Sequence, residues 1–385
     1  MKFNKSTQNF SFVAIGRLFG SGSQAIFYFI FAFFLEPELY GEMSYLIALA
    51  GTFSIISRFG LNQTVTVYQA KNENSIVNQI NVLSLLTTSV AAIILLPITI
   101  FAAFLALSLS FFPMNQNNFL GQKNYKKFMF ISITRSILLI VIPVSLFFVW
   151  DISGILIGMT ISYFICSLDF LRKIKFQINS FNEIKNNFSV IIHNFGADLS
   201  TNLSRRIDKL LIAPLLGFTS LGIYQFNIQI LFGLELIPIA IHSFLLSEES
   251  SGKKYKKIEY YAILMSIIIS LIIFFIAPSV IENILPEYSE GIPSLQLLVL
   301  TLIPLSIMAI LNAKLQALES KKIGYSALIR IGSLLILIAT VGNWYGLMGL
   351  SISVLLSVIL HVIFLAILYT STKYKRNSSV NSSKR

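Results

Sequence analysis

Residues 253–282 read KKYKKIEYYAILMSIIISLIIFFIAPSVIE, and this stretch decides the class of the fold. Its middle part, 260–281, holds 22 residues without a charged side chain. Roughly 20 mostly apolar residues are enough for a helix to cross a bilayer. Four lysines precede the apolar part and a glutamate follows it. Since cytoplasmic loops are rich in Lys and Arg, we expect a transmembrane helix whose amino-terminal end is cytoplasmic.

The same pattern recurs along the chain of 385 residues, of which 55% are hydrophobic and only 12% are charged. A soluble domain is usually about one quarter charged, so lipid must surround most of this protein. We predict an all-α polytopic membrane protein with about twelve transmembrane helices. The predicted helices span residues 12–34, 42–67, 81–97, 99–118, 126–149, 152–171, 188–216, 221–246, 258–281, 290–313, 325–342 and 346–369.

The net charge is +12, and the distribution of the basic residues along the chain predicts the orientation of the helices. One set of loops, with the helix ends beside it, carries 21 of the 29 basic residues, and the other set carries none. By the positive-inside rule the basic loops and both termini are cytoplasmic. A wrong number of helices would break this alternation. The charge is therefore explained without nucleic acid as a partner.

The two halves of the sequence match each other. The matched pairs are Arg135 with Arg330 and Gly154 with Gly349 at a shift of 195 residues, and Gly41 with Gly222 at a shift of 181. We predict two pseudo-twofold-related six-helix lobes, over residues 1–175 and 176–372, and a disordered cytoplasmic tail over 373–385. Because each repeat has an even number of helices, the pseudo-twofold axis runs along the membrane normal and the substrate site lies between the lobes.

The sequence gives no sign of a cofactor or metal site. Its one cysteine, Cys166, lies in an apolar run, so neither an internal disulfide nor a thiol metal site is expected. The HExxH motif and the glycine-rich phosphate loop are absent from the sequence.

Charged side chains inside the predicted helices point to a cavity. Eight bases lie within these helices or at their ends, and three acids lie within them, with Asp169 and Glu259 at cytoplasmic ends. An arginine near the centre of a membrane helix costs about 2.5–3.5 kcal/mol on insertion scales. The acids leave about five positive charges without a partner, and an anionic substrate would supply the missing negative charge. The bases are Arg17, Arg58, Arg135, Arg205, Arg206, Lys209, Lys314 and Arg330, and the acids are Asp198, Asp208 and Glu235.

The first and seventh predicted helices each carry a polar stripe on one face. The stripes are Arg17, Gly20, Ser21, Gln24 and Tyr28 in the first helix, and Asn194, Asp198, Thr201, Asn202, Arg205 and Lys209 in the seventh. Their spacings keep these side chains on one side of a helix. Two such stripes facing each other would line a central cavity.

Some of these charges could instead be neutralised or solvated locally. Arg205 and Asp208 stand three residues apart and could neutralise each other. Arg17 could reach the interface by snorkelling, and Arg135 and Arg330 could do the same toward the cytoplasmic headgroups. The candidate substrate-binding residues are Arg17, Gln24, Arg58, Arg135, Asp198, Asn202, Arg205, Arg206, Asp208, Lys209 and Arg330.

Two of these candidates suggest further roles. Arg58 lies at a depth similar to that of Arg135 and Arg330, and the three would form a basic ring that loads substrate from the cytoplasmic side. Asp198 is a candidate site for a coupling proton or sodium ion, because it shares a helical face with Arg205.

Several motifs resemble those of a known family. They are SRRIDKLL at 204–211 with Leu216-Gly217 and Gly222-Ile223-Tyr224 after it, LEPELYG at 35–41, Phe59-Gly60-Leu61, and LPEY at 285–288. Their order and spacing resemble Wzx-type polysaccharide flippases of the multidrug/oligosaccharidyl-lipid/polysaccharide exporter superfamily. The tight hairpin between the third and fourth helices departs from that family.

The resemblance implies a multi-pass protein of the plasma membrane that moves a polyprenyl-pyrophosphate-linked glycan from the cytoplasmic to the outer leaflet. The lipid tail would stay among membrane lipids while the head crosses the cavity, by rocking of two lobes. The arginines would meet the pyrophosphate.

Two other classes of function compete with this one. A multidrug cation antiporter of the same superfamily would share the fold, but its cavity should be acidic. A membrane glycosyltransferase or polymerase needs a site on a sizeable loop, and the longest outward loop here is about 282–290. We therefore expect a transporter and not an enzyme.

Overall fold

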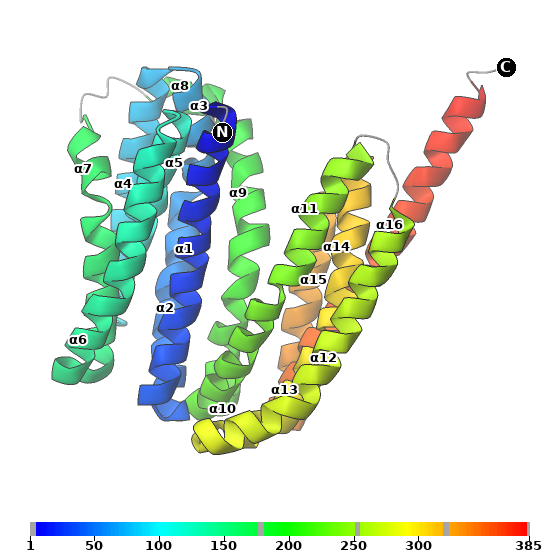
Figure 1. The fold of residues 1–385 in the computed structure, drawn as a ribbon. Coiled ribbons are helices and arrows are strands. Elements are labelled where there is room, and N and C mark those ends of the chain that lie inside the picture. Colours follow the sequence, from blue (N-terminus) through cyan, green and yellow to red (C-terminus); the bar gives the residue numbers. More distant parts are fainter. Residues whose placement is uncertain (1–4, 176–180, 251–254, 319–322, 383–385) are drawn as a thin grey trace. The chain divides into compact units, whose positions relative to one another are not determined.

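The computed structural model describes residues 5–175, 181–250, 255–318 and 323–382. Every regular element among these residues is a helix (Figure 1), which confirms the all-α prediction. Seven segments in this part of the chain are long and apolar enough to cross a membrane. Each of the twelve predicted spans falls on helical segments. Some charges used to predict the orientation, Lys2, Lys253, Lys254, Lys321, Lys322, Lys384 and Arg385, lie outside the described residues.

The chain divides into two compact units. Unit 1 comprises residues up to Phe34 and Glu42–Leu210, and unit 2 comprises Leu35–Gly41 and the residues from Leu211 onward. The lobe boundary at 175/176 and the disorder of the tail after 372 stay predictions. The last helix of the structure ends at Ser382.

Unit 1 is a bundle in which α1 packs along α6, and α5 lies between α4 and α6. Side chains of α3, α4, α5, α7, α8 and α9 form one buried core that includes Leu61, Ile80 and Met114. The elements are α1 (Lys5–Phe34), α2 (Pro37–Arg58), α3 (Leu61–Ala70), α4 (Asn74–Leu95), α5 (Ile100–Gly121), α6 (Tyr125–Ile165), α7 (Leu168–Lys173), α8 (Asn182–Asn186), α9 (Phe188–Asn202) and the 3₁₀ turn η1 (Leu203–Arg205).

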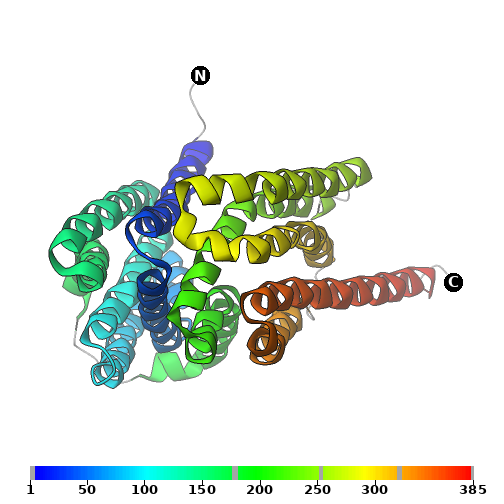
Figure 2. The same ribbon diagram turned by 90° about the horizontal axis from the view of Figure 1, so that it is seen from below.

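Unit 2 contains most of α10 and all elements after it. Here α11 packs on α14, and α15 lies beside α16 (Figure 2). The elements are α10 (Ile207–Leu234), α11 (Leu236–Ser250), α12 (Lys256–Ile284), the 3₁₀ helix η2 (Pro286–Gly291), α13 (Ile292–Val299), α14 (Leu302–Ala317), α15 (Ile323–Leu337), the π-helical turn η3 (Ile338–Gly342) and α16 (Asn343–Ser382).

Helix α6 has 41 residues, about 60 Å at 1.5 Å per residue, which is twice the hydrocarbon thickness. Its path reverses at Asp151, where φ is 47° and ψ is −135°. A Cβ on Gly154 would meet the backbone O of Leu146, so the two arms pack against each other as a hairpin. The hydroxyl of Ser162 donates to the backbone O of Leu138 (2.9 Å). This element covers the fifth predicted span and residues 152–165 of the sixth, whose end falls on α7.

The predicted repeat is visible in the backbone. Gly346 in α16 has φ 56° and ψ −135°, nearly the same as Asp151, which lies 195 residues earlier. A Cβ on Gly349 would meet the backbone O of Val341, which is the counterpart of Leu146 at that shift. The two halves therefore share both the reversal and its closest contact.

A second pair of repeat-related residues makes a reciprocal contact inside unit 2. A Cβ on Gly41 would meet the backbone O of Phe218, and a Cβ on Gly222 would meet the backbone O of Pro37. Since 37 and 218 differ by 181, as do 41 and 222, the contact has local twofold character. Tyr288 closes this cluster, because its hydroxyl donates to the backbone O of Leu35 (3.0 Å).

The seventh predicted span, 188–216, differs from a single helix. It consists of α9, η1 and the start of α10, with Arg206 outside helical geometry at φ −128° and ψ −34°. The break turns the side chain of Arg206 toward α2 of unit 1. The polar stripe of this span is therefore not one continuous face.

Candidate functional site

A buried ion pair joins α2 to α9 in unit 1. Arg58 Nη2 lies 3.7 Å from Asp198 Oδ2, and the two residues are only 6% and 1% exposed. Asn202 Nδ2 donates to Asp198 Oδ1 (2.8 Å). The acid at position 198 is thus compensated by protein groups. We call Arg58, Asp198 and Asn202 the α2–α9 network.

The position of Arg58 follows from a proline on α5. Pro113 lies inside α5 and has no backbone N–H, so the carbonyl four residues earlier loses its helical donor. That carbonyl, the backbone O of Leu109, accepts from Arg58 Nη1 at 2.8 Å. Ser54 Oγ accepts from the same nitrogen (3.1 Å). Two protein acceptors and one carboxylate therefore hold the guanidinium.

The remaining polar residues of the seventh span point in different directions. Asn194 Nδ2 donates to Thr64 Oγ1 of α3 (2.9 Å). Asn202 and Arg205 are exposed, whereas Asp208 and Lys209 are buried. Lys209 Nζ lies 3.3 Å from Asp208 Oδ1. Asp208 is the acid that the sequence offers as a partner of Arg205, and Lys209 places a second positive charge beside it.

Arg206 docks on α2 at a glycine. A Cβ on Gly51 would overlap the guanidinium of Arg206, so the guanidinium lies directly against this backbone position. Arg206 Nη1 also donates to the backbone O of Ile47 (3.4 Å). Only a residue without a side chain leaves room for this contact. The break in the helix after η1 is what brings Arg206 to α2.

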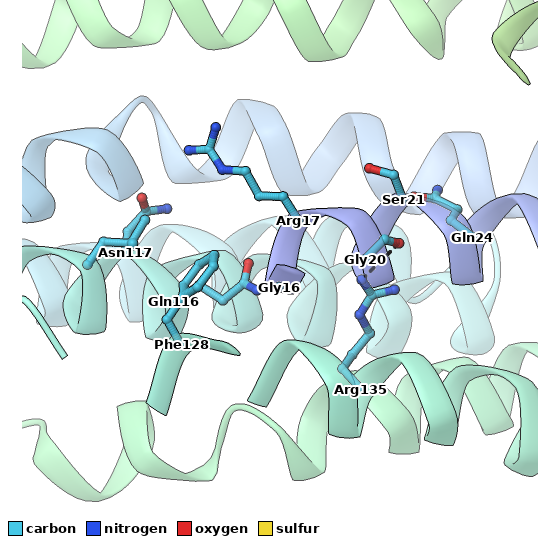
Figure 3. Close-up of a pocket in the computed structure, with 10 residues that line it drawn as sticks. Gly16, Arg17, Gly20, Ser21, Gln24, Gln116, Asn117, Phe128 and Arg135 are labelled. Carbon is cyan, nitrogen blue, oxygen red and sulfur yellow. Dashed lines mark hydrogen bonds between the residues drawn. The ribbon is translucent and has the colours of Figure 1, made fainter. Parts of the chain in front are cut away.

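A cavity of about 380 Å³ lies between α1, α5 and α6 of unit 1 (Figure 3). We call it the α1 pocket. Its lining contains arginine, amide, hydroxyl and aromatic groups and no carboxylate. The lining residues are Gly16, Arg17, Gly20, Ser21, Gln24, Gln116, Asn117, Leu120, Phe128 and Arg135. Three predicted residues, Arg17, Gln24 and Arg135, therefore share one pocket.

Arg135 is fixed in the wall of the α1 pocket. Its guanidinium lies 5.5 Å from the ring centroid of Phe112 and 5.4 Å from that of Tyr163, which are distances of cation–π contact. Nη2 donates to the backbone O of Gly20 (3.1 Å) and Nη1 to Ser23 Oγ (3.3 Å). The residue is 5% exposed. Its Nε is a buried donor with no acceptor among the described residues.

Arg17 differs from Arg135 in its surroundings. It is exposed, and its guanidinium points away from Arg135 in Figure 3. In the described part of the chain no carboxylate forms an ion pair with it. An anion entering the pocket would therefore find an unneutralised charge at Arg17.

Sequence reasoning missed two amides of the pocket, Gln116 and Asn117. They belong to the run Asn115-Gln116-Asn117-Asn118, four amides in succession within a predicted membrane helix. Such a run is costly in lipid unless its members find partners. Asn117 has found them, since Thr66 Oγ1 donates to its Oδ1 (3.1 Å) and its Nδ2 donates to the backbone O of Pro113 (2.9 Å).

The three arginines of the predicted basic ring lie in two different units. Arg58 belongs to the α2–α9 network and Arg135 to the wall of the α1 pocket, whereas Arg330 lies in unit 2, half-buried on α15. The ring therefore stays a prediction. Unit 2 holds another ion pair, between Lys314 Nζ of α14 and Glu259 Oε2 of α12 (2.6 Å). Within the described residues no group of three potential metal ligands comes together.

The chain is similar to known membrane proteins over most of its length. An uncharacterized membrane protein of Methanocaldococcus jannaschii is 24% identical over 393 residues, which cover 90% of this chain and 93% of that protein. A structure of the lipid II flippase MurJ in an inward closed conformation matches with a TM-score of 0.75 at 16% identity, over 93% of this chain and 87% of that chain.

A multidrug resistance MATE family transporter of the MOP superfamily, in an inward-facing conformation, matches with a TM-score of 0.63 at 14% identity. The match covers 91% of this chain and 99% of that one. At these identities the likeness shows the fold alone. These two structures are described as those of a flippase and of a transporter.

The family model described as "Polysaccharide biosynthesis protein" matches residues 6–244. This range includes α1 through most of α11, and with it the α1 pocket and the α2–α9 network. The resemblance inferred from the sequence motifs agrees with this match and with the fold. The chain is a multi-pass membrane protein that belongs to the polysaccharide biosynthesis protein family.

Proposed function

We propose that the protein is a flippase that moves a polyprenyl-pyrophosphate-linked oligosaccharide from the cytoplasmic to the outer leaflet by alternating access. The observation that carries this proposal is the charge balance inside unit 1. Leaving out residues at the ends of the spans, its predicted membrane helices hold six cations and two carboxylates. The cations are Arg17, Arg58, Arg135, Arg205, Arg206 and Lys209, and the carboxylates are Asp198 and Asp208.

Two carboxylates cannot neutralise six cations, so a net charge of four remains within this unit. Cations in a membrane interior are costly unless water or an anion accompanies them. A pyrophosphate carries compensating negative charge and accepts bidentate hydrogen bonds from arginine. The family membership and the transporter fold support the same class of function.

A multidrug cation antiporter is the competing proposal, and the same charges argue against it. A cavity for organic cations needs uncompensated acid. Here Arg58 lies beside Asp198, and Lys209 lies beside Asp208. The α1 pocket offers no carboxylate at all.

Entry from the cytoplasmic leaflet is part of the proposal. Three lining residues of the α1 pocket, Gln116, Asn117 and Leu120, lie in the last turns of α5, close to the turn that joins α5 to α6. That turn carries Lys123, with Lys126 and Lys127 just after it. Placing these lysines and both termini on the cytoplasmic side follows the positive-inside rule.

Asp198 is the proposed site of a coupling proton or sodium ion. Its Oδ2 is buried and has no hydrogen-bond partner among the described residues, and it faces Arg58 at the long distance of 3.7 Å. Binding a cation there would weaken the hold of α9 on α2. Uptake of protons or sodium by proteoliposomes, compared between the wild type and Asp198→Asn, tests this part of the proposal.

Binding to purified protein tests the proposed substrate class. We expect a polyprenyl-pyrophosphate glycan to bind, and the same glycan on a neutral polyprenol to bind at least tenfold more weakly. Charge-assisted hydrogen bonds of about 1.5–3 kcal/mol each are lost in the neutral lipid. Tight binding of organic cations, with equal affinity for both lipids, would favour the antiporter instead.

A further inference from the structure

We propose that the α1 pocket is the subsite for the first sugar next to the pyrophosphate, and that the side-chain amides of Gln24 and Gln116 recognise this sugar. The inference rests on the proposed function, since it deepens the substrate class. The pocket supplies what a sugar requires: neutral groups that donate and accept hydrogen bonds, beside a positive charge for the phosphate.

The volume of the pocket leaves room for a small ligand group. Ligand pockets in proteins range over about 300–1,000 Å³, and this one holds about 380 Å³. This space is enough for one sugar unit beside a phosphate. The proposal therefore has this site select the lipid-proximal sugar.

Gln116 is held in an orientation suited to recognition. Its Nε2 donates to Ser132 Oγ (2.8 Å), and that hydroxyl in turn donates to the backbone O of Phe128 (2.7 Å). The chain of donors leaves Gln116 Oε1 as an acceptor to which no described residue donates. A sugar hydroxyl is the donor that this oxygen lacks.

Gln24 completes the polar surface from α1. Its side chain is half-buried, and no described residue hydrogen-bonds to it. Figure 3 shows Gln24, Ser21 and Arg17 along the same helix, with Arg17 nearer to Gln116 and Asn117. Arg17 thus places a positive charge beside the neutral amides of the same pocket.

Arg135 acts on this subsite as a positioning residue. Its two terminal nitrogens tie α6 to Gly20 and Ser23 of α1, and two aromatic rings fix its plane. Ser136 Oγ adds a bond to the backbone O of Phe19 (3.0 Å). These contacts fix the register of α1, and so of Gln24, against α6, to which Gln116 is tied through Ser132.

The test compares two lipids that differ only in the sugar. Binding of a glycosylated polyprenyl pyrophosphate and of the bare polyprenyl pyrophosphate is measured with wild-type protein, Gln24→Leu and Gln116→Leu. The matched control is Gln122→Leu, since Gln122 is exposed at the end of α5 outside the pocket. Each pocket variant should lose about 3- to 10-fold in affinity for the glycosylated lipid, the size of one or two neutral hydrogen bonds.

The bare lipid should bind all four proteins with equal affinity, which also shows that the variants are folded. Ser132→Ala, which frees the amide of Gln116, should cause a smaller loss for the glycosylated lipid alone. Unchanged affinity for the glycosylated lipid, or an equal loss for both lipids, overturns the sugar subsite. If wild-type protein binds neither lipid, the proposed function itself fails, and that result is distinct from the other two.

Discussion

The buried pair in the α2–α9 network allows a quantitative prediction of stability. Arg58→Met keeps the length and apolar stem of the side chain but removes its charge. Asp198, which is 1% exposed, then keeps one hydrogen bond, from Asn202. Removing one partner of a buried ion pair costs about 3–5 kcal/mol, because the other charge stays buried without compensation.

This cost converts into a measurable shift of the melting temperature. About 1 kcal/mol shifts Tm by roughly 2–4 °C for a unit of 150–250 residues, so Arg58→Met should lower Tm by about 6–20 °C. The double variant Arg58→Met with Asp198→Leu should recover most of this loss. Replacing both partners of a buried pair by apolar groups is often neutral.

The assay is thermal unfolding of purified protein in detergent, with Lys127→Met as the matched control. Lys127 pairs with Asp169 at 2.9 Å, but the two side chains are 40% and 31% exposed. An exposed pair contributes about 0–1 kcal/mol, so this control should shift Tm by at most a few degrees. The reasoning is refuted if Arg58→Met melts like the control, or if the double variant is no more stable than the single one.

Three further predictions concern other contacts. Gly51→Ala should displace the guanidinium of Arg206 and slow transport while Tm changes little. Adding Arg206→Gln to this variant should slow transport no further, and additive losses would mean that the two residues act independently. Lys314→Met leaves Glu259, which is 17% exposed, so Tm should fall by less than for the fully buried pair; an equal or larger fall contradicts this ranking. Gly41→Ala places a methyl group against a backbone carbonyl and should cost at least about 1–3 kcal/mol as overpacking, measured as a lower Tm; wild-type stability would mean that the contact is not tight.

The fold could be predicted because membrane insertion leaves few choices. Only helices satisfy the backbone within a single segment in lipid, so an apolar run such as 260–281 determines its own secondary structure. The uneven distribution of Lys and Arg between alternate loops predicted the direction in which each helix crosses the membrane. The repeat followed from pairs such as Gly154 and Gly349, whose lack of a side chain is needed for the hairpin contact.

Local geometry escaped prediction where tertiary contacts decide it. Nothing near position 206 breaks a helix by propensity; the break there coincides with the docking of Arg206 on Gly51, 155 residues earlier in the sequence. The sequence also did not predict that Arg58 donates to the backbone O of Leu109 on α5, because this contact depends on a carbonyl that Pro113 leaves without its helical donor.

The candidate site was predicted in part. Charge counting found Arg17 and Arg135 because ionised groups are expensive in lipid. The neutral amide Gln116 carries no charge and was passed over, although its place in a run of four amides was a usable signal. Its neighbour Asn117 shows why the signal is ambiguous, since that amide is satisfied within the protein.

The most direct test of the proposed function is translocation in proteoliposomes. A fluorescent polyprenyl-pyrophosphate oligosaccharide is placed in both leaflets, and the fraction protected from a membrane-impermeant quencher is followed over time under a proton or sodium gradient. We predict protein-dependent movement of the labelled head group between leaflets, lost in Arg17→Gln and retained in Gln122→Leu. Movement no faster than in protein-free vesicles, with export of organic cations by the same protein, would contradict the account.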